Sequence, residues 1–208
     1  MSFDALLGRS MRKEHFLYGT TNAGKLAEIK VLAERYEIDL IGLGEIEKQE
    51  GLSQAPAVLE NGVSYEENAA LKAKAYASWS GRSCFADDSG LEIDCLEGLP
   101  GVFTARFGFE RVRKMLNGMR NVEARLICCV AYAEPSGRSV AVTKSLAGNV
   151  ELGLADVKAK ETLPFSYVFI PKGQSLSLAN LLATNDSATV PFLSHRGQAV
   201  LSLLRALS

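Results

Sequence analysis

Two stretches of the sequence carry residues whose types and spacing suit phosphate chemistry. In the first, LYGTTNAGKLAE at 17–28, Gly19, Gly24 and Lys25 have nearly the spacing of the phosphate-binding loop of many ATPases. That loop continues with a Ser or Thr whose hydroxyl holds magnesium, but here the next residue is Leu26. The stretch is therefore either a defective ATPase loop or a different phosphate-binding turn.

A strand followed by a tight turn and a helix would form such a turn. The apolar run 15–19 predicts a buried strand, and apolar periodicity predicts a helix from about Ala23 to Tyr36, capped by Asn22. The free N–H groups at a helix N-terminus attract anions. Side chains that could add to this binding are those of Thr20, Thr21, Asn22 and Lys25. The alternative is that Asn22 only caps the helix and that Lys25 is a solvated surface lysine.

The second stretch, FADDSGLEID, offers carboxylates. Asp87 and Asp88 come where an apolar strand is predicted to end before a Ser-Gly turn, and ligands of α/β proteins gather at such strand ends. Consecutive strand residues face opposite ways, so one aspartate would face a cleft while the other caps the turn or pairs with a base. Mg²⁺ uses one or two carboxylates plus phosphates and water, and Glu60 is the candidate for the second, although a surface acid is its commoner role.

Further basic residues lie on predicted helices. Lys72 projects from a helix that begins after Ser64, and Ser194 can cap a last helix with His195 and Arg196 in its first turn. Cations in a first turn oppose the helix dipole, a cost that a bound anion would offset. The alternatives are a solvated lysine and a surface His-Arg pair.

The remaining pattern predicts a mixed α/β fold. The first strand, helix and next strand favour a parallel pair, and the break EPSGR predicts a hairpin. The stretch from Gly44 to Gly62 reads as a loop, and the Ser64/Glu67 capping box opens a helix that ends near Trp79. Further strands are expected at 38–43, 83–90, 91–96, 125–133, 139–148 and 165–171, and further helices at 109–119 and from Ser194 onward.

Composition excludes several classes of partner. The chain has 208 residues and a formal net charge of −1, which argues against a surface built for nucleic acid or membrane. No segment has the ~20 apolar residues of a membrane helix, and the charge order at the start is wrong for a signal peptide. The four cysteines include no C-x-x-C pair and are expected to be free core thiols. We therefore expect a soluble, cytoplasmic protein.

Several motifs together resemble one family. The stretches TTNAGKLAEIK, ENGVSYEENAALKAKAYA, ADDSGLEIDCLEGLPGVFTARF and SHRGQA, in this order, are similar to those of the Ham1/inosine triphosphate pyrophosphatase family. The resemblance covers 15–208 as one domain and leaves 1–14 as an N-terminal extension. It implies an elongated mixed twisted sheet flanked by helices, two lobes with a nucleotide cleft between them, and a homodimer. It also implies Mg²⁺-dependent hydrolysis of nucleoside triphosphates such as ITP, dITP and XTP to monophosphate and pyrophosphate.

The resemblance also implies roles for individual residues. Asp88 would be the general base on the attacking water and would lie by the metal, with Glu60 as a second metal-side carboxylate. Asn22, Lys25 and Lys72 would hold the triphosphate. His195 and Arg196 would reach the base or its adjoining phosphate. The substrate-binding positions are Thr20, Thr21, Asn22, Lys25, Lys72, Ser89, Phe165, His195 and Arg196.

Two departures from the family pattern concern base recognition. The segment LPFSYVFIPKG keeps Phe165 and Tyr167 but lacks the Asp-Pro that usually follows, and no lysine lies shortly before Ser194. We therefore expect a relaxed or shifted base preference. Two alternatives stay open, namely a nucleotide-binding protein with weak turnover that senses or sequesters nucleotides, and a true P-loop ATPase or GTPase, against which Leu26 argues.

Overall fold

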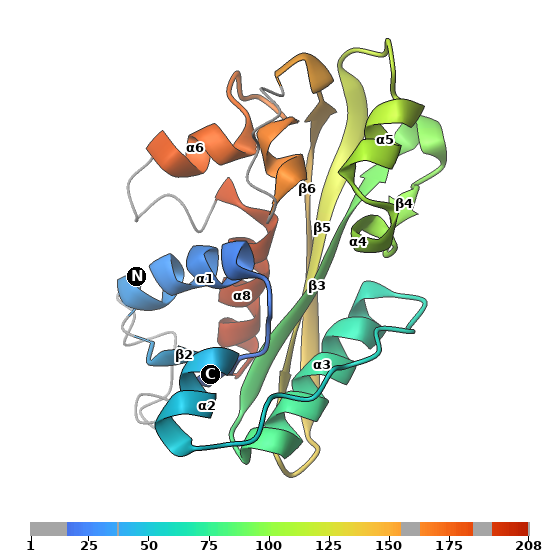
Figure 1. Ribbon diagram of the computed structural model, residues 1–208. Coiled ribbons are helices and arrows are strands. Elements are labelled where there is room, and N and C mark those ends of the chain that lie inside the picture. Colours follow the sequence, from blue (N-terminus) through green and yellow to red (C-terminus); the bar gives the residue numbers. More distant parts are fainter. Residues whose placement is uncertain (1–15, 37, 155–162, 185–192, 208) are drawn as a thin grey trace.

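The computed structural model, which describes residues 16–36, 38–154, 163–184 and 193–207, shows a mixed α/β fold (Figure 1). The sheet has the strand order β2-β1-β3-β5-β6-β7, with β4 paired to β3. The strand β1 is parallel to β2 and β3, and the other pairings are antiparallel. The strands are β1 (Phe16–Tyr18), β2 (Leu40–Gly42), β3 (Cys84–Ile93), β4 (Pro100–Gly101), β5 (Val122–Ala133), β6 (Ser139–Val150) and β7 (Phe169–Pro171).

Helices cover both faces of this sheet (Figure 1). They are α1 (Ala23–Arg35), α2 (Leu43–Glu50), α3 (Tyr65–Ser80), α4 (Thr104–Phe107), α5 (Phe109–Met115), α6 (Leu178–Thr184) and α8 (His195–Leu207). Short 3₁₀ turns occur at Asp94–Leu96, Leu152–Leu154 and Pro164–Tyr167. Within the described ranges, no helix combines the length and the apolar character that crossing a bilayer requires.

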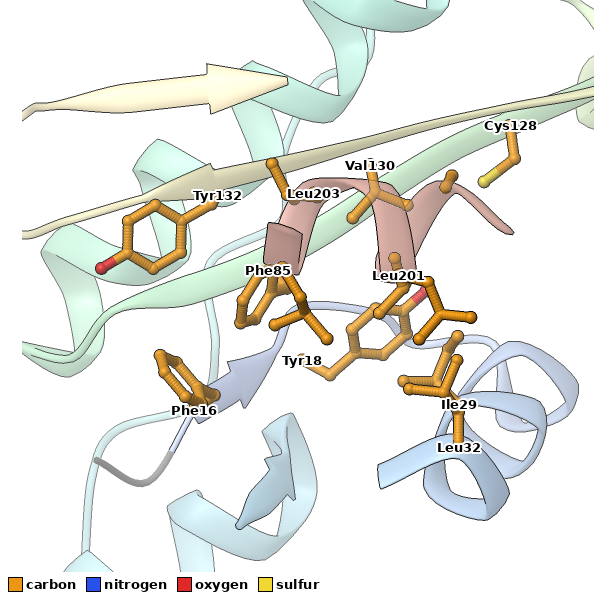
Figure 2. Close-up of a cluster of buried hydrophobic side chains, with 13 residues drawn as sticks. Phe16, Tyr18, Ile29, Leu32, Phe85, Cys128, Val130, Tyr132, Leu201 and Leu203 are labelled. Atoms are coloured by element: carbon orange, nitrogen blue, oxygen red, sulfur yellow. The ribbon is translucent and has the colours of Figure 1, made fainter. Parts of the chain in front are cut away.

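The alternation of side chains along β5 separates two hydrophobic clusters. Cys128, Val130 and Tyr132 face α1 and α8, where they pack with residues of β1 (Figure 2). The residues between them face α3 on the other side of the sheet. Successive strand residues point to opposite faces, so one strand supplies both clusters. The prediction that the adjacent cysteines face apart is confirmed.

A third cluster fills the other end of the long strands. It takes Leu91 and Ile93 from β3 and Leu126 from β5, and it packs them with residues of α5, α6 and β7. The core is thus divided into two parts along β3 and β5, as the expectation of two lobes required. The residues of β3 between them, Asp87 to Gly90, belong to neither part.

Most predicted elements are present, and the crossover from β1 through α1 to β2 gives the predicted parallel pair, with Phe16 opposite Leu40. The expectation of a loop over 44–62 is wrong for its first part, which forms α2. Leu43 and Ile46 are buried there, and Glu45 accepts a hydrogen bond from the N-cap amide of Gly42. Burial and capping therefore outweigh the low helix propensity of Gly44.

The break predicted at Ser89-Gly90 is also wrong. The strand β3 continues without interruption to Ile93, because β5 pairs with its whole length. The separate strand expected over 91–96 is the end of β3 as far as Ile93, and Asp94–Leu96 forms a 3₁₀ turn. Asp87 and Asp88 lie in the middle of β3, and polar residues at this position led to the wrong prediction of a strand end.

Three smaller predictions need correction. The segment 165–171 begins as a 3₁₀ turn, Pro164–Tyr167, and only Phe169–Pro171 is a strand, consistent with proline at a helix start. The helix expected over 109–119 ends at Met115. All four cysteines are free, but Cys95 is exposed rather than in the core because it lies in a surface 3₁₀ turn.

The close contact between β6 and β7 gives a stability prediction. A Cβ on Gly148 would press against the carbonyl oxygen of Ile170 and lie 2.7 Å from the ring of Phe169. We expect Gly148→Ala to lower the free energy of unfolding by about 1–3 kcal/mol, as overpacking does. Urea denaturation checks this.

The matched control is Gly44→Ala, at an open position in α2 where a Cβ meets no atom within 4 Å. Because alanine favours a helix over glycine, this variant should be at least as stable as the wild type. Equal stability of the two variants would contradict the packing described for β6 and β7.

Candidate active site

Asp87 and Asp88 lie in the middle of β3, where one edge of the strand is open. On one side β5 pairs along the whole strand. On the other side β1 pairs only as far as Phe85, and β4 begins its pairing at Leu91. None of the described strands pairs with Ala86 to Gly90 on that side. The unpaired part of β3 therefore includes both aspartates.

On the face toward α1 and α8, Asp87 lies in a buried cluster of charges. Its Oδ2 is 2.9 Å from Lys25 Nζ and 3.3 Å from Arg196 Nε, and the hydroxyl of Tyr18 donates to its Oδ1 at 2.6 Å. Arg196 also pairs with Glu28. Burial alone would raise the pKa of Asp87, but Lys25 and Arg196 outweigh it and hold that pKa well below its usual range. Asp87 is thus an ionised counter-ion of Lys25 and Arg196, which confirms the prediction that one of the two aspartates pairs with a basic residue.

The turn before α1 is closed by its own side chains. Asn22 Oδ1 accepts from the amides of Gly24 at 2.9 Å and of Lys25 at 3.0 Å. Thr20 Oγ1 in turn accepts from the amide of Asn22 at 3.2 Å, and Thr21 is exposed. The capping role considered for Asn22 is therefore confirmed. The idea that Lys25 is a solvated surface lysine is wrong, because its ammonium pairs with Asp87.

The likeness of this turn to an ATPase loop has packing causes. Gly19 lies so close to the ring of Tyr76 and to Cys84 Sγ that a Cβ would be 3.1 Å from the sulfur. Leu26 packs toward β2, where its Cδ2 would lie 2.9 Å from a Cβ on Gly42. Gly19 and Leu26 are thus both required for packing in the protein interior, and position 26 does not need a hydroxyl group.

At the start of α8, His195 and Arg196 are both buried, with 6% and 2% of their surface exposed, so the alternative of a surface pair is wrong. Ser194 caps the helix by accepting from Gly197 N at 2.8 Å, as predicted. Arg196 Nη2 donates to Ser89 Oγ at 3.1 Å. Burial, helped by Arg196, lowers the pKa of His195 well below its ordinary value, so its imidazole is neutral at pH 7. Its Nδ1 is buried without a hydrogen-bond partner among the described residues.

On the opposite face of β3, Asp88 lies beside α3. Asn68 Nδ2 donates to its Oδ2 at 3.0 Å, and Lys72 Nζ is 3.8 Å from its Oδ1. Lys72 also donates to Glu60 Oε2 at 2.6 Å. Burial raises the pKa of Asp88, and the opposing effects of Lys72 and Asn68 do not cancel this. Asp88 is therefore a stronger base than an ordinary aspartate.

Lys72 differs from the solvated helix lysine considered as the alternative. Burial alone would lower its pKa, but Asp87, Asp88 and Glu60 outweigh that effect and raise it. Lys72 is thus charged although it is largely buried. The influence of Asp87 on Lys72, from the other face of the strand, indicates that the two clusters form one electrostatic unit.

The arrangement fits a magnesium ion in its donor set. The carboxylates of Glu60 and Asp88 converge on one cation, the ammonium of Lys72. In the part of the chain that the structure describes, no group of three or more His, Cys, Asp or Glu side chains could hold a metal. Two carboxylates completed by phosphate oxygens and water are the usual ligands of Mg²⁺, so the residues present suit that ion.

The structure also identifies participants that the sequence did not. Asn68 precedes Lys72 by one helical turn, and Glu28 follows Lys25 by nearly one, so each lies on the same helix face as a predicted residue. Both are close neighbours of that residue in space. Helical spacing from a predicted lysine was therefore the signal that could have found them.

Phe165 lies apart from these two clusters. Its ring contacts that of Phe109, with centroids 5.4 Å apart, and it packs on the third hydrophobic cluster. Its contact with a substrate stays a prediction. The other predicted site residues converge on the open edge of β3 or on the turn before α1.

The chain is similar to several known proteins. The model of the Ham1 family matches residues 16–206. A dITP/XTP pyrophosphatase of Deinococcus deserti is 33% identical, over 96% of this chain and 92% of its own length. One from an Exiguobacterium species is 34% identical, over 90% of this chain and 93% of its own. A solved structure of a Ham1 protein from Coxiella burnetii is 26% identical and has a TM-score of 0.69, over 92% of this chain and 97% of that one.

The family model spans nearly the whole described chain, and the solved relative shares its fold. The segments that carry Asp87, Asp88, Lys25 and Arg196 all lie within the matched residues. The chain therefore belongs to the Ham1 family.

Proposed function

We propose that the protein hydrolyses nucleoside triphosphates to the nucleoside monophosphate and pyrophosphate, with deaminated purine nucleotides such as ITP, dITP and XTP as preferred substrates. One observation carries this proposal. A buried carboxylate, Asp88, lies at an open strand edge beside the Lys72–Glu60 pair, while Lys25 and Arg196 approach the same strand from its other face. The relatives named dITP/XTP pyrophosphatases support the reaction class.

Asp88 is the proposed general base. Attack of water at the α-phosphorus requires that a carboxylate accept the proton of the water. The side-chain amide of Asn68 and the backbone N–H of Ser89 fix the two oxygens of Asp88, so its carboxylate is oriented for this role. Asp87 is unsuited to this role, because its pKa is held well below the usual range.

Lys25 and Lys72 are the proposed partners of the phosphates. Each pairs with a carboxylate of this chain, so an incoming triphosphate would compete for ammonium groups that are already charged and oriented. Asp87 keeps Arg196 and Tyr18 as partners, so Lys25 can turn toward a phosphate without leaving that carboxylate alone. Preorganised cations of this kind stabilise the charge that develops on the leaving pyrophosphate.

Glu60 and Asp88 would hold the proposed Mg²⁺. When bound, this ion supplies positive charge to the phosphate oxygens. The ion and Lys72 would then balance the negative charge of the phosphates at the reacting end of the nucleotide, and the two carboxylates would hold the ion there. A homodimer stays a prediction from the family resemblance.

The proposed specificity for deaminated purines involves His195. Its buried, neutral imidazole has an Nδ1 without a partner among the described residues, and it lies next to Arg196, which contacts Ser89. A neutral imidazole can both donate and accept a hydrogen bond, as a purine edge demands. Leaving such a group unpaired costs ~1–3 kcal/mol, which is enough to discriminate between bases.

Pyrophosphate release tests the proposal directly. Wild-type protein with Mg²⁺ should release pyrophosphate and monophosphate from ITP, dITP or XTP more efficiently than from ATP or GTP, because the base edge is recognised by hydrogen bonds. The missing Asp-Pro after Tyr167 and the missing lysine before Ser194 should limit this preference to about tenfold. Release should stop when the metal is chelated. The equal amounts of monophosphate and pyrophosphate distinguish this reaction from an ATPase reaction, which gives diphosphate and orthophosphate. Binding of ITP without any product would favour the nucleotide sensor.

Replacement of the base gives a second test. We expect Asp88→Asn to lower kcat for the best substrate by ~10²–10⁴-fold, the usual contribution of a general base, while the protein stays folded. The matched control is Asp94→Asn, an exposed carboxylate that pairs with Arg125. Turnover by Asp88→Asn equal to that of the control would remove Asp88 from the role of base.

A further inference from the structure

Asn68 is held at both ends of its side-chain amide. It is a residue of α3 with only 1% of its surface exposed. Its Nδ2 donates to Asp88 Oδ2 at 3.0 Å, and its Oδ1 accepts from Gly62 N at 2.8 Å. An amide oxygen only accepts and an amide nitrogen only donates, so the reverse orientation would place donor against donor and acceptor against acceptor. The two partners therefore fix one orientation of the amide.

The partner at the second end belongs to the segment that carries Glu60. Gly62 packs directly on α3, where a Cβ would lie 2.7 Å from Glu67 Cβ and 2.8 Å from Asn68 Oδ1. The next residue is bound as well, because Val63 N donates to Glu67 Oε2 at 2.7 Å. The backbone that follows Glu60 is thus fixed by side chains of the first turn of α3.

Asn68 and Lys72 act as a pair on this helix. They are four residues apart, so they project from the same face of α3. Both contact Asp88 of β3, and α3 lies beside that strand (Figure 1). Lys72 contacts the side chains of Glu60 and Asp88. Asn68 contacts the side chain of Asp88 and the backbone beyond Glu60. Asp88 is therefore joined to this segment twice, through Lys72 to the carboxylate of Glu60 and through the amide of Asn68 to the backbone at Gly62.

Both oxygens of Asp88 have a donor. Oδ2 receives the amide of Asn68, and Oδ1 receives the backbone N–H of Ser89 at 3.0 Å. Two donors at opposite oxygens prevent rotation of the carboxylate about χ2. Lys72, at 3.8 Å, is too distant to fix it in the same way. The orientation of the proposed base thus depends on Asn68.

We propose that Asn68 is the positioning residue of this site. It orients the Asp88 carboxylate toward the open edge of β3 and sets its place relative to Glu60. This inference rests on the proposed function, in which Asp88 accepts a proton from water. Asn68 acts through Asp88 and Gly62 and does not itself meet the nucleotide.

Two substitutions separate the two ends of the amide. Asn68→Asp has nearly the same shape and keeps an acceptor for Gly62 N, but it replaces the donor to Asp88 with a second carboxylate, whose charge also acts on Asp88. Asn68→Ala removes both contacts. The matched control is Asn149→Ala, which removes an amide that donates to the backbone of Asn121 on another part of the sheet.

Steady-state kinetics with the best nucleotide, at neutral pH with Mg²⁺, form the first measurement. We expect Asn68→Asp and Asn68→Ala to lower kcat by about 10- to 100-fold, because a small misplacement of a reacting group has effects of that size. KM should stay within about threefold of the wild type, because Lys25 and Arg196 are unaffected. The control should match the wild type in both constants.

Hydrogen–deuterium exchange at the Gly62 amide, without nucleotide or metal, provides a readout that is independent of turnover. Asn68→Ala should speed exchange there, because the acceptor is lost, while Asn68→Asp should keep the protection of the wild type. A general loss of fold would instead speed exchange across the core strands as well.

A further variant, Gly62→Ala, keeps Asn68 but places a Cβ against its Oδ1. This variant tests the role of Asn68 if Asn68→Asp does not fold. We expect a lower kcat and an unchanged KM for it. If the wild type is active, a kcat equal to that of the wild type in Asn68→Asp or Gly62→Ala overturns the inference about Asn68 but not the proposed function. A decrease in kcat that is equally large in the control variant has the same consequence. Absence of pyrophosphate release from the wild type itself overturns the proposed function.

Discussion

The structure depends on two adjacent aspartates that point to opposite faces of one strand. Because successive side chains of β3 alternate, Asp87 lies among Lys25, Arg196 and Tyr18, and Asp88 lies among Asn68, Lys72 and Glu60. The strand is open on one edge between β1 and β4, so both faces meet at one place. A single dipeptide thereby joins two half-sites carried by helices from distant parts of the sequence.

The two carboxylates do different work because their surroundings differ. Burial costs each of them solvation. Around Asp87 the cations outweigh this cost and hold its pKa well below the usual range, whereas around Asp88 burial prevails and the pKa is raised. The first aspartate therefore binds α1 and α8 to the sheet, and the second remains a base. Asn68 supplies what charge alone does not, namely a fixed orientation.

Much of this site could be predicted from the sequence, because local motifs determine it. The Asn22 cap, the Ser64/Glu67 start of α3 and the alternation at Asp87-Asp88 are short-range features, and all are present. The burial of Arg196 could not be predicted, since its counter-charges Glu28 and Asp87 lie far away in the sequence. The length of β3 was missed for a similar reason. Only its pairing with β5 shows that polar residues occupy the middle of a strand.

The central claim is that Asp87 stabilises the fold while Asp88 is kept for chemistry. The most direct measurement is the free energy of unfolding of Asp87→Asn and Asp88→Asn at pH 7, without nucleotide or metal. Loss of a partner for buried cations should destabilise Asp87→Asn by about 3–5 kcal/mol. A raised pKa means that the folded state disfavours the ionised form of Asp88, so loss of its charge is not destabilising. Asp88→Asn leaves one of the two donors, Asn68 or Ser89, without an acceptor, so it should be destabilised by only about 1 kcal/mol. Equal destabilisation of the two variants, or wild-type stability of Asp87→Asn, would contradict the claim.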